Sequence, residues 1–282
     1  MKAMEIGVIV DMTDQIGSIF KNLQQAGIRT CQLNTFDEEW LSDDMVKLVK
    51  NAADQCDVEI TAFWCGWPGP RVWNFYEGQA TLGLVPPLYR LCRLEVLQKG
   101  SDFAAKLGIA DLITHVGFIP ENPNDPEYSG VVQALKQLVK HCQSHGQYFL
   151  FETGQETPVT LKRTIEDIGL PNMGVNLDPA NLIMYGKANP LDAVDMLGDL
   201  IRGVHAKDGE YPIDGKNLGQ EKRLGEGKVN YPAFIEKLIR LNYKGALTIE
   251  CEIAGEEHIK EVILAKKQLE TWILSAGKDD RA

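Results

Sequence analysis

The chain has 282 residues, of which 44% are hydrophobic and 24% charged, so it can bury a large core as a soluble globular protein. Its formal net charge of -11 argues against nucleic acid as a partner, because proteins that bind phosphate backbones usually carry a basic face. No apolar run approaches the roughly 18 residues of a membrane helix, and the N-terminal segment resembles no signal peptide. We therefore expect a cytoplasmic protein with no membrane partner.

The six cysteines form no C-x-x-C pair and no zinc-finger spacing. In a chain of this length, that pattern predicts reduced and mostly buried thiols rather than a disulfide framework.

Short β-rich segments alternate along the chain with longer amphipathic segments. The predicted strands are residues 5–11, 29–36, 58–65, 111–118, 148–153, 173–179, 201–208 and 246–253. Helical patterns lie between them and a last one covers residues 258–274. Eight such units predict an α/β fold, a single-domain (β/α)8 TIM barrel over residues 1–282. A doubly wound open sheet is the alternative, although no glycine-rich phosphate fingerprint follows the first strand.

Ionisable side chains mark the C-terminal ends of the last four predicted strands. They are Glu152, Asp178, His205 with Lys207, and Glu250 with Glu252. In a barrel these ends share one rim, where the reaction site lies. Converging carboxylates repel each other and are costly to desolvate unless a cation joins them. Carboxylates with one imidazole suit Mn²⁺, Mg²⁺ or Co²⁺, and we favour Mn²⁺. Taken singly, each group could instead be an ion pair or a helix cap.

Four motifs, in this order, resemble the xylose isomerase-like TIM-barrel superfamily. They are the Glu of FETG, the Asp of NLDPAN, the HAKD of the seventh strand, and the Glu five residues after the glycine in YKGALTIE. The segment LGEGKVNYP also resembles the glycine-spaced loop of that family. The superfamily includes D-tagatose 3-epimerase, hydroxypyruvate isomerase, inosose dehydratase and the apurinic endonuclease IV group.

The resemblance implies a divalent metal and a small keto-sugar substrate. The implied metal ligands are Glu152, Asp178, His205 and Glu250. Glu152 and Glu250 would also act as acid and base, moving a proton beside a ketone through an enediolate. This implies a metal-dependent sugar isomerase or epimerase. Glu252 is the rival ligand on the eighth strand, but the spacing from Gly245 favours Glu250.

Other side chains near the predicted rim are candidates for substrate binding. His115 matches a frequent histidine of the superfamily, although it could equally be a hydrogen-bonded core residue. Lys207 could hold a substrate oxygen or pair with a carboxylate such as Glu252. Asn181 stands where the epimerase members carry a histidine, and the first arginine after the seventh strand, Arg223, follows a long insertion. These departures leave the substrate open.

An aromatic segment, FWCGWPGPRVWNFYEG, follows the third predicted strand. It contains Trp64, Trp67, Trp73, Phe75 and Tyr76. These rings could form a wall that stacks on a sugar, with Trp64 as the candidate for substrate binding, or they could only bury a long loop.

His141 and His145 have the i, i+4 spacing that can chelate a metal on a helix. They lie at the end of a helical pattern, away from the predicted rim, so we expect a solvated surface pair.

Three other functions compete with the isomerase or epimerase. A dehydratase or lyase acting on a keto-sugar or 3-keto-glycoside would use the same metal and base. An apurinic endonuclease-like nuclease is remote, because that group needs several strand-end histidines and the chain is acidic. A binding protein without activity is the last. Whether copies associate as a homo-oligomer stays open.

Overall fold

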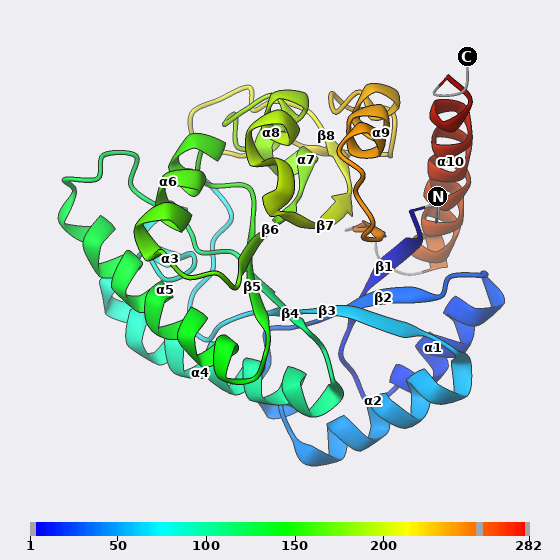
Figure 1. Cartoon of the computed structure of the whole chain (residues 1–282), viewed down its shortest axis with the longest axis horizontal. Helices are drawn as coiled ribbons and strands as arrows, with labels where there is room; N and C mark the ends of the chain where they lie inside the picture. The colour runs from blue at the N-terminus through cyan, green and yellow to red at the C-terminus, as the bar shows by residue number, and fades with distance from the viewer. Residues whose placement is uncertain (1–3, 252–255, 280–282) are drawn as a thin grey trace.

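Eight parallel strands close into a barrel with the helices on its outside. A computed structural model describes residues 4–251 and 256–279. The strands follow each other around the barrel in the order β1-β10-β7-β6-β5-β4-β3-β2 (Figure 1). The predicted (β/α)8 barrel is therefore confirmed, and the open sheet was the wrong alternative.

The strands are short and mostly separated by longer helices. The barrel strands are β1 (Ile6–Asp11), β2 (Thr30–Thr35), β3 (Glu59–Cys65), β4 (Asp111–Thr114), β5 (Tyr148–Glu152), β6 (Met173–Leu177), β7 (Ile201–Ala206) and β10 (Leu247–Ile249). The α-helices are α1 (Ile16–Gln25), α2 (Asp43–Cys56), α3 (Gly78–Thr81), α4 (Pro87–Leu107), α5 (Pro126–Ser144), α6 (Pro158–Ile168), α7 (Pro179–Met184), α8 (Pro190–Leu197), α9 (Tyr231–Arg240) and α10 (Glu256–Asp279). An antiparallel pair, β8 (Asp208–Gly209) with β9 (Glu221–Lys222), lies in the long insertion after β7.

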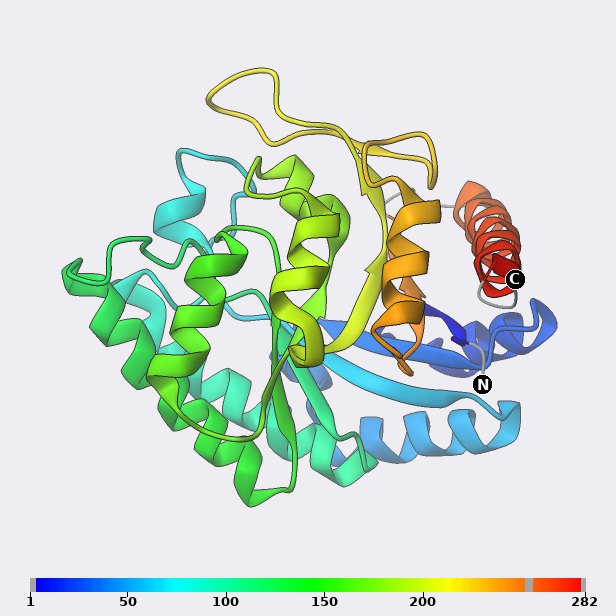
Figure 2. The same cartoon turned by 45° about the horizontal axis from the view of Figure 1, so that its top comes forward.

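Local chemistry explains where the helices begin and end. Proline occupies the start of α5, α6, α7 and α8, where its missing N–H costs nothing. Gly108 ends α4 in the left-handed conformation, with φ of 78°. Figure 2 shows the helices packed around the strands, and α10 lies against β1, as in Figure 1. Among the described residues, every helix is either too short or too polar to span a lipid bilayer.

Several strands end earlier than the sequence pattern predicts, and the first residue after each of them is polar or charged. β4 ends at Thr114, β6 at Leu177 and β10 at Ile249. Asp178 leaves the strand because its Oδ1 accepts the Asn181 N–H at 2.8 Å and thereby caps α7. Polar residues that directly follow a strand can turn toward the barrel axis, and this is where the candidate site lies.

The barrel interior contains polar residues as well as apolar ones. Gln32, Asn176, Thr30 and Thr248 are all buried within it. The larger apolar core lies between the strands and the surrounding helices. Four of the six cysteines are buried, Cys92 is exposed and Cys251 is partly exposed, close to the expectation of mostly buried thiols.

Candidate metal centre at the barrel mouth

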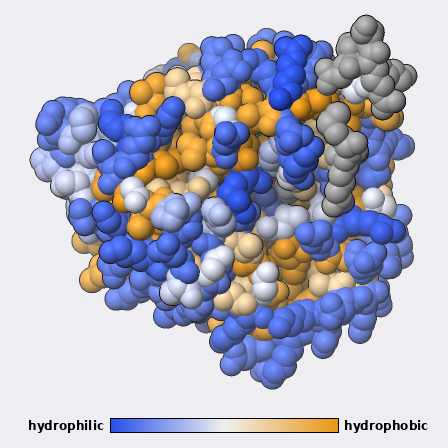
Figure 3. Space-filling model, viewed as in Figure 1, coloured by the Kyte–Doolittle hydropathy of each residue, from blue (hydrophilic) through white to orange (hydrophobic). Residues whose placement is uncertain are grey.

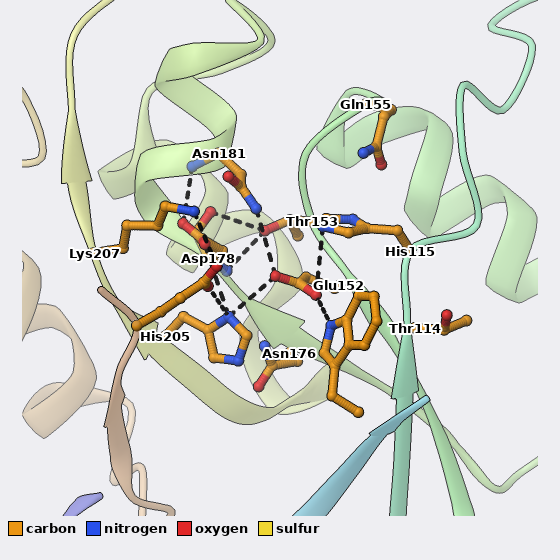
Figure 4. A network of polar contacts seen from close by, with 12 residues as sticks. Thr114, His115, Glu152, Thr153, Gln155, Asn176, Asp178, Asn181, His205 and Lys207 are labelled. Atoms are coloured by element: carbon orange, nitrogen blue, oxygen red, sulfur yellow. Dashed lines mark hydrogen bonds and ion pairs between the residues drawn. The ribbon is translucent and has the colours of Figure 1, made fainter. Parts of the chain in front are cut away.

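The four predicted metal ligands converge at the C-terminal ends of neighbouring strands. Glu152 ends β5, Asp178 directly follows β6, His205 lies within β7 and Glu250 directly follows β10. One ligand atom from each lies within 4.8 Å of the others. The first three are at most 2% exposed, and the Glu250 side chain is 21% exposed. Figure 4 shows Glu152, Asp178 and His205 directed at one another.

A single imidazole nitrogen faces three carboxylates. The Nδ1 atom of His205 lies 2.8 Å from Glu250 Oε2, 3.1 Å from Glu152 Oε1 and 3.8 Å from Asp178 Oδ2. This nitrogen carries at most one proton, so it cannot satisfy three acceptors. His205 Nδ1, Asp178 Oδ2 and Glu250 Oε2 are indeed buried without a hydrogen bond of acceptable geometry. A divalent cation coordinated by all four groups would remove this conflict, so the residues fit a metal.

The electrostatics of the cluster point the same way. Burial opposes a charge on His205, but Glu152, Asp178 and Glu250 outweigh it and raise the pKa of the imidazole well above its ordinary value. Burial raises the pKa of Asp178 to about 6, with a further contribution from the Glu250 charge. The cluster therefore demands positive charge, which a protonated imidazole or a divalent ion can supply.

The other nitrogen of His205 has a partner that the sequence analysis missed. His205 Nε2 lies 2.9 Å from Gln32 Oε1, and Gln32 Nε2 donates to Asn176 Oδ1 at 3.3 Å. The bond to Asn176 directs the Gln32 oxygen at the imidazole, so Nε2 carries the proton and the neutral ring offers its Nδ1 lone pair to a cation. A glutamine and an asparagine within largely buried strands, TCQLNT and MGVNL, were the available signals.

Three residues predicted to bind substrate surround Glu152. The Trp64 indole N–H donates to Glu152 Oε2, and His115 Nε2 lies 3.5 Å from the same oxygen. Asn181 Nδ2 lies 3.5 Å from Glu152 Oε1. Burial lowers the pKa of His115, more than the nearby carboxylates raise it, and favours the neutral ring. These contacts fix the orientation of Glu152, while all three side chains also line the cavity above it.

Lys207 pairs with Glu250. Its Nζ lies 3.0 Å from Glu250 Oε1, and the lysine side chain is only 3% exposed. Sequence reasoning also considered a pair between Lys207 and Glu252, but Glu252 lies outside the described residues. Burial opposes ionisation of Glu250, but Lys207 and His205 outweigh it and hold the pKa of Glu250 well below its ordinary value. Glu250 is therefore an ionised carboxylate held by two cationic partners.

A cavity of about 1060 Å³ opens above the cluster and continues over β1 toward α10. Trp64 and Trp73 from the aromatic segment line it, together with Phe36 and Tyr185, which sequence reasoning missed. Within the same segment, Trp67 is only 1% exposed and packs in the core, whereas Tyr76 is 68% exposed. The rings of this segment are therefore divided between the cavity wall and the core, and stacking on a sugar stays a prediction. Figure 3 shows hydrophobic patches interleaved with hydrophilic surface on the side of the molecule that faces the viewer in Figure 1.

His141 and His145 lie away from this cluster, as predicted, in the last turn and at the C-cap of α5. They are partly exposed, but they are not simply solvated, because both contact the carboxylate of Asp102.

Comparisons with known proteins give the same fold and a family. The family model described as xylose isomerase-like TIM barrel matches residues 20–271. The crystal structure of a xylose isomerase domain protein from Planctomyces limnophilus has a TM-score of 0.91 and 31% identity, covering 98% of this chain and 99% of that one. A structure of L-ribulose 3-epimerase shares the fold, with a TM-score of 0.74 at 17% identity over 99% of this chain and 97% of that one.

Sequence relatives match over a smaller part of the chain. The Escherichia coli protein named "Putative L-ribulose-5-phosphate 3-epimerase SgbU" is 32% identical over 120 residues, which are 41% of each chain. The chain spans between 41% and 66% of the length of the curated relatives that it matches.

Proposed function

We propose an activity for this chain, which belongs to the xylose isomerase-like TIM barrel family. It is a divalent-metal-dependent isomerase or epimerase of a keto-sugar. The convergence of Glu152, Asp178, His205 and Glu250 within 4.8 Å carries this proposal. The donor set suits Mn²⁺, which we favour, and also Mg²⁺ or Co²⁺. When bound, the ion would acidify the C–H beside the ketone of the substrate and stabilise the negative charge that develops on its oxygens.

Two carboxylates can move the proton from opposite sides. Glu152 and Glu250 come from β5 and β10, which β6 and β7 separate around the barrel. Trp64 and Asn181 hold Glu152, and Lys207 holds Glu250, so neither carboxylate must reorient before it reacts. Glu152 removes the proton, and Glu250 returns one on the other face or to the neighbouring carbon.

The charge around the cavity favours an uncharged sugar. Asp11, Glu152, Glu221 and Glu250 line it, whereas Lys207 is the single lysine or arginine among its described lining residues. Lys207 is already paired with Glu250. A phosphorylated sugar would bring further negative charge into this cavity, where the proposed divalent ion and Lys207 are already matched by carboxylates. The substrate therefore differs from the phosphate ester named for the E. coli relative.

Proton exchange in D₂O tests the proposal. The purified chain is stripped with a chelator, reloaded with Mn²⁺ and incubated with a panel of ketoses and keto-glycosides. NMR after removal of the ion should show deuterium beside the ketone, with an epimer or isomer as product. Glu152→Gln and Glu250→Gln should each slow this exchange by about 10²-fold or more, because each removes an acid–base group.

Glu156→Gln is the matched control, since Glu156 is a buried glutamate four residues from Glu152 outside the cluster. It should leave the exchange unchanged. Exchange that survives chelation, or that both glutamine variants retain, would refute the proposal. An enone product with ultraviolet absorbance would assign a dehydratase or lyase instead.

A further inference from the structure

Among the described residues, a second group of histidine and carboxylate side chains converges on the outer wall of the barrel. His141 lies in the last turn of α5 and His145 is the C-cap residue of that helix. Asp102 faces them from α4, which packs against α5 (Figure 1). The three residues come from the ends of these helices that precede β4 and β5, opposite to the barrel mouth.

Three ligand atoms of this group point into one small volume. His141 Nε2 lies 2.7 Å and His145 Nε2 lies 2.8 Å from the same oxygen, Asp102 Oδ1. One ligand atom from each of the three residues lies within 4.8 Å of the others. If each imidazole only made a hydrogen bond to Asp102, the two rings could have used different oxygens of its carboxylate. In a tetrahedral zinc site the ligand atoms are about 3.3 Å apart, so widening these contacts by about 0.5 Å would admit the ion.

We propose that Asp102, His141 and His145 form a second metal site, which binds Zn²⁺ and links α4 to α5. Two imidazoles four residues apart on a helix chelate one ion on a single face. Two imidazoles and one carboxylate suit Zn²⁺ better than Mn²⁺ or Mg²⁺, in contrast to the oxygen-rich mouth.

The site is open to solvent, and its position lets a bound ion connect two helices. The side chains of His141, His145 and Asp102 are 28%, 34% and 48% exposed, so the ion enters from solvent and water supplies the fourth ligand. The bound ion ties the C-terminal end of α5 to α4, three residues before β5 begins. Because unfolding separates the ligands, Zn²⁺ binding stabilises the folded chain.

Calorimetric titration with ZnCl₂ alone tests the site on the full chain, after all metal has been removed. All variants carry Asp178→Asn, which removes one carboxylate ligand from the barrel mouth. The asparagine keeps the side-chain oxygen that caps α7. In this background, His145→Gln should remove one Zn²⁺ per chain or lower its affinity by on the order of tenfold or more. Gln143→Ala, an exposed change on the same helix turn, should leave the titration unaltered.

Thermal unfolding gives an independent readout. Saturating Zn²⁺ should raise the Tm of the Asp178→Asn parent and of its Gln143→Ala variant, but not of its His145→Gln variant. Equal Zn²⁺ affinity with and without His145, or no Zn²⁺ binding by the parent, overturns the proposal. The site is separate from the proposed function, so His145→Gln in the otherwise unaltered chain should leave sugar exchange unchanged.

Discussion

Gln32 shows how one residue far from the substrate can prepare a metal ligand. It lies on the strand beside β1, and its amide joins His205 on β7 to Asn176 on β6 through the barrel interior. The acceptor oxygen of Gln32 keeps the proton on His205 Nε2 and leaves Nδ1 for the cation. Such partners of a ligating histidine commonly tune metal affinity.

Gln32→Leu should therefore weaken Mn²⁺ binding by about 10–100-fold, because the ring loses the acceptor that sets its tautomer. Electron paramagnetic resonance of free Mn²⁺ during a titration measures this affinity. Gln32→Glu keeps an acceptor oxygen and should bind Mn²⁺ more tightly than Gln32→Leu. Equal affinity in the wild type and Gln32→Leu would show that other contacts orient His205.

Glu156 predicts a pH dependence of stability. Burial raises its pKa to about 8, and its side chain is almost fully buried. The unfolded value is about 4.3, so between these values the folded chain binds more protons than the unfolded chain. The free energy of unfolding therefore falls as pH rises through this window. Glu156→Gln removes the titration, and its Tm should exceed that of the wild type by more at pH 8 than at pH 6. Parallel Tm profiles would contradict this.

At the scale of elements, Asp208 organises the glycine-spaced loop between β9 and α9. Its carboxylate accepts the backbone N–H groups of Gly209, Gly225, Gly227 and Val229 at 2.9–3.1 Å. A Cβ atom at Gly227 would lie 2.1 Å from Asp208 Oδ1, which explains the glycine there. Asp208, which directly follows Lys207, therefore holds this loop in place.

Asp208→Ala should lower the free energy of unfolding by about 2 kcal/mol or more, because four N–H groups lose a charged acceptor. Urea unfolding measures this, and limited proteolysis should cut residues 210–230 faster. Asp208→Asn keeps one acceptor oxygen and should lose less. A loop as resistant to protease in Asp208→Ala as in the wild type would show that other contacts hold it.

At the scale of the whole molecule, the acidic charge bears on which sugar enters the cavity. The chain carries a net charge of -11, and carboxylates outnumber the one lysine around the cavity. Together these charges produce a negative potential that repels anionic substrates and leaves uncharged ones unaffected.

We expect kcat/KM to be higher for an uncharged ketose than for its phosphate ester. The value for the ester should rise with added salt, because repulsion is screened over about 10 Å at 0.1 M ionic strength. The value for the uncharged sugar should stay constant over the same range. Steady-state rates with both substrates measure this. An ester preferred at low salt would contradict the expected substrate class.

The sequence by itself was sufficient for the barrel and for the positions of the candidate ligands. Strand and helix periodicities are local properties, and eight repeats of one unit leave few architectures. Closure then brings the C-terminal strand ends to one rim, so Glu152, Asp178, His205 and either Glu250 or Glu252 could be grouped from their positions, and the family resemblance selected Glu250.

Only the tertiary structure decided which side chains are partners. Gln32 meets Asn176 across 144 positions of sequence, and Asp102 meets two histidines from a different helix. The pairing of Lys207 with Glu250 also depends on where β10 ends, because Glu250 directly follows its last residue. Such contacts depend on strand register and on the closure of the barrel, and neither is encoded in a local pattern of residues.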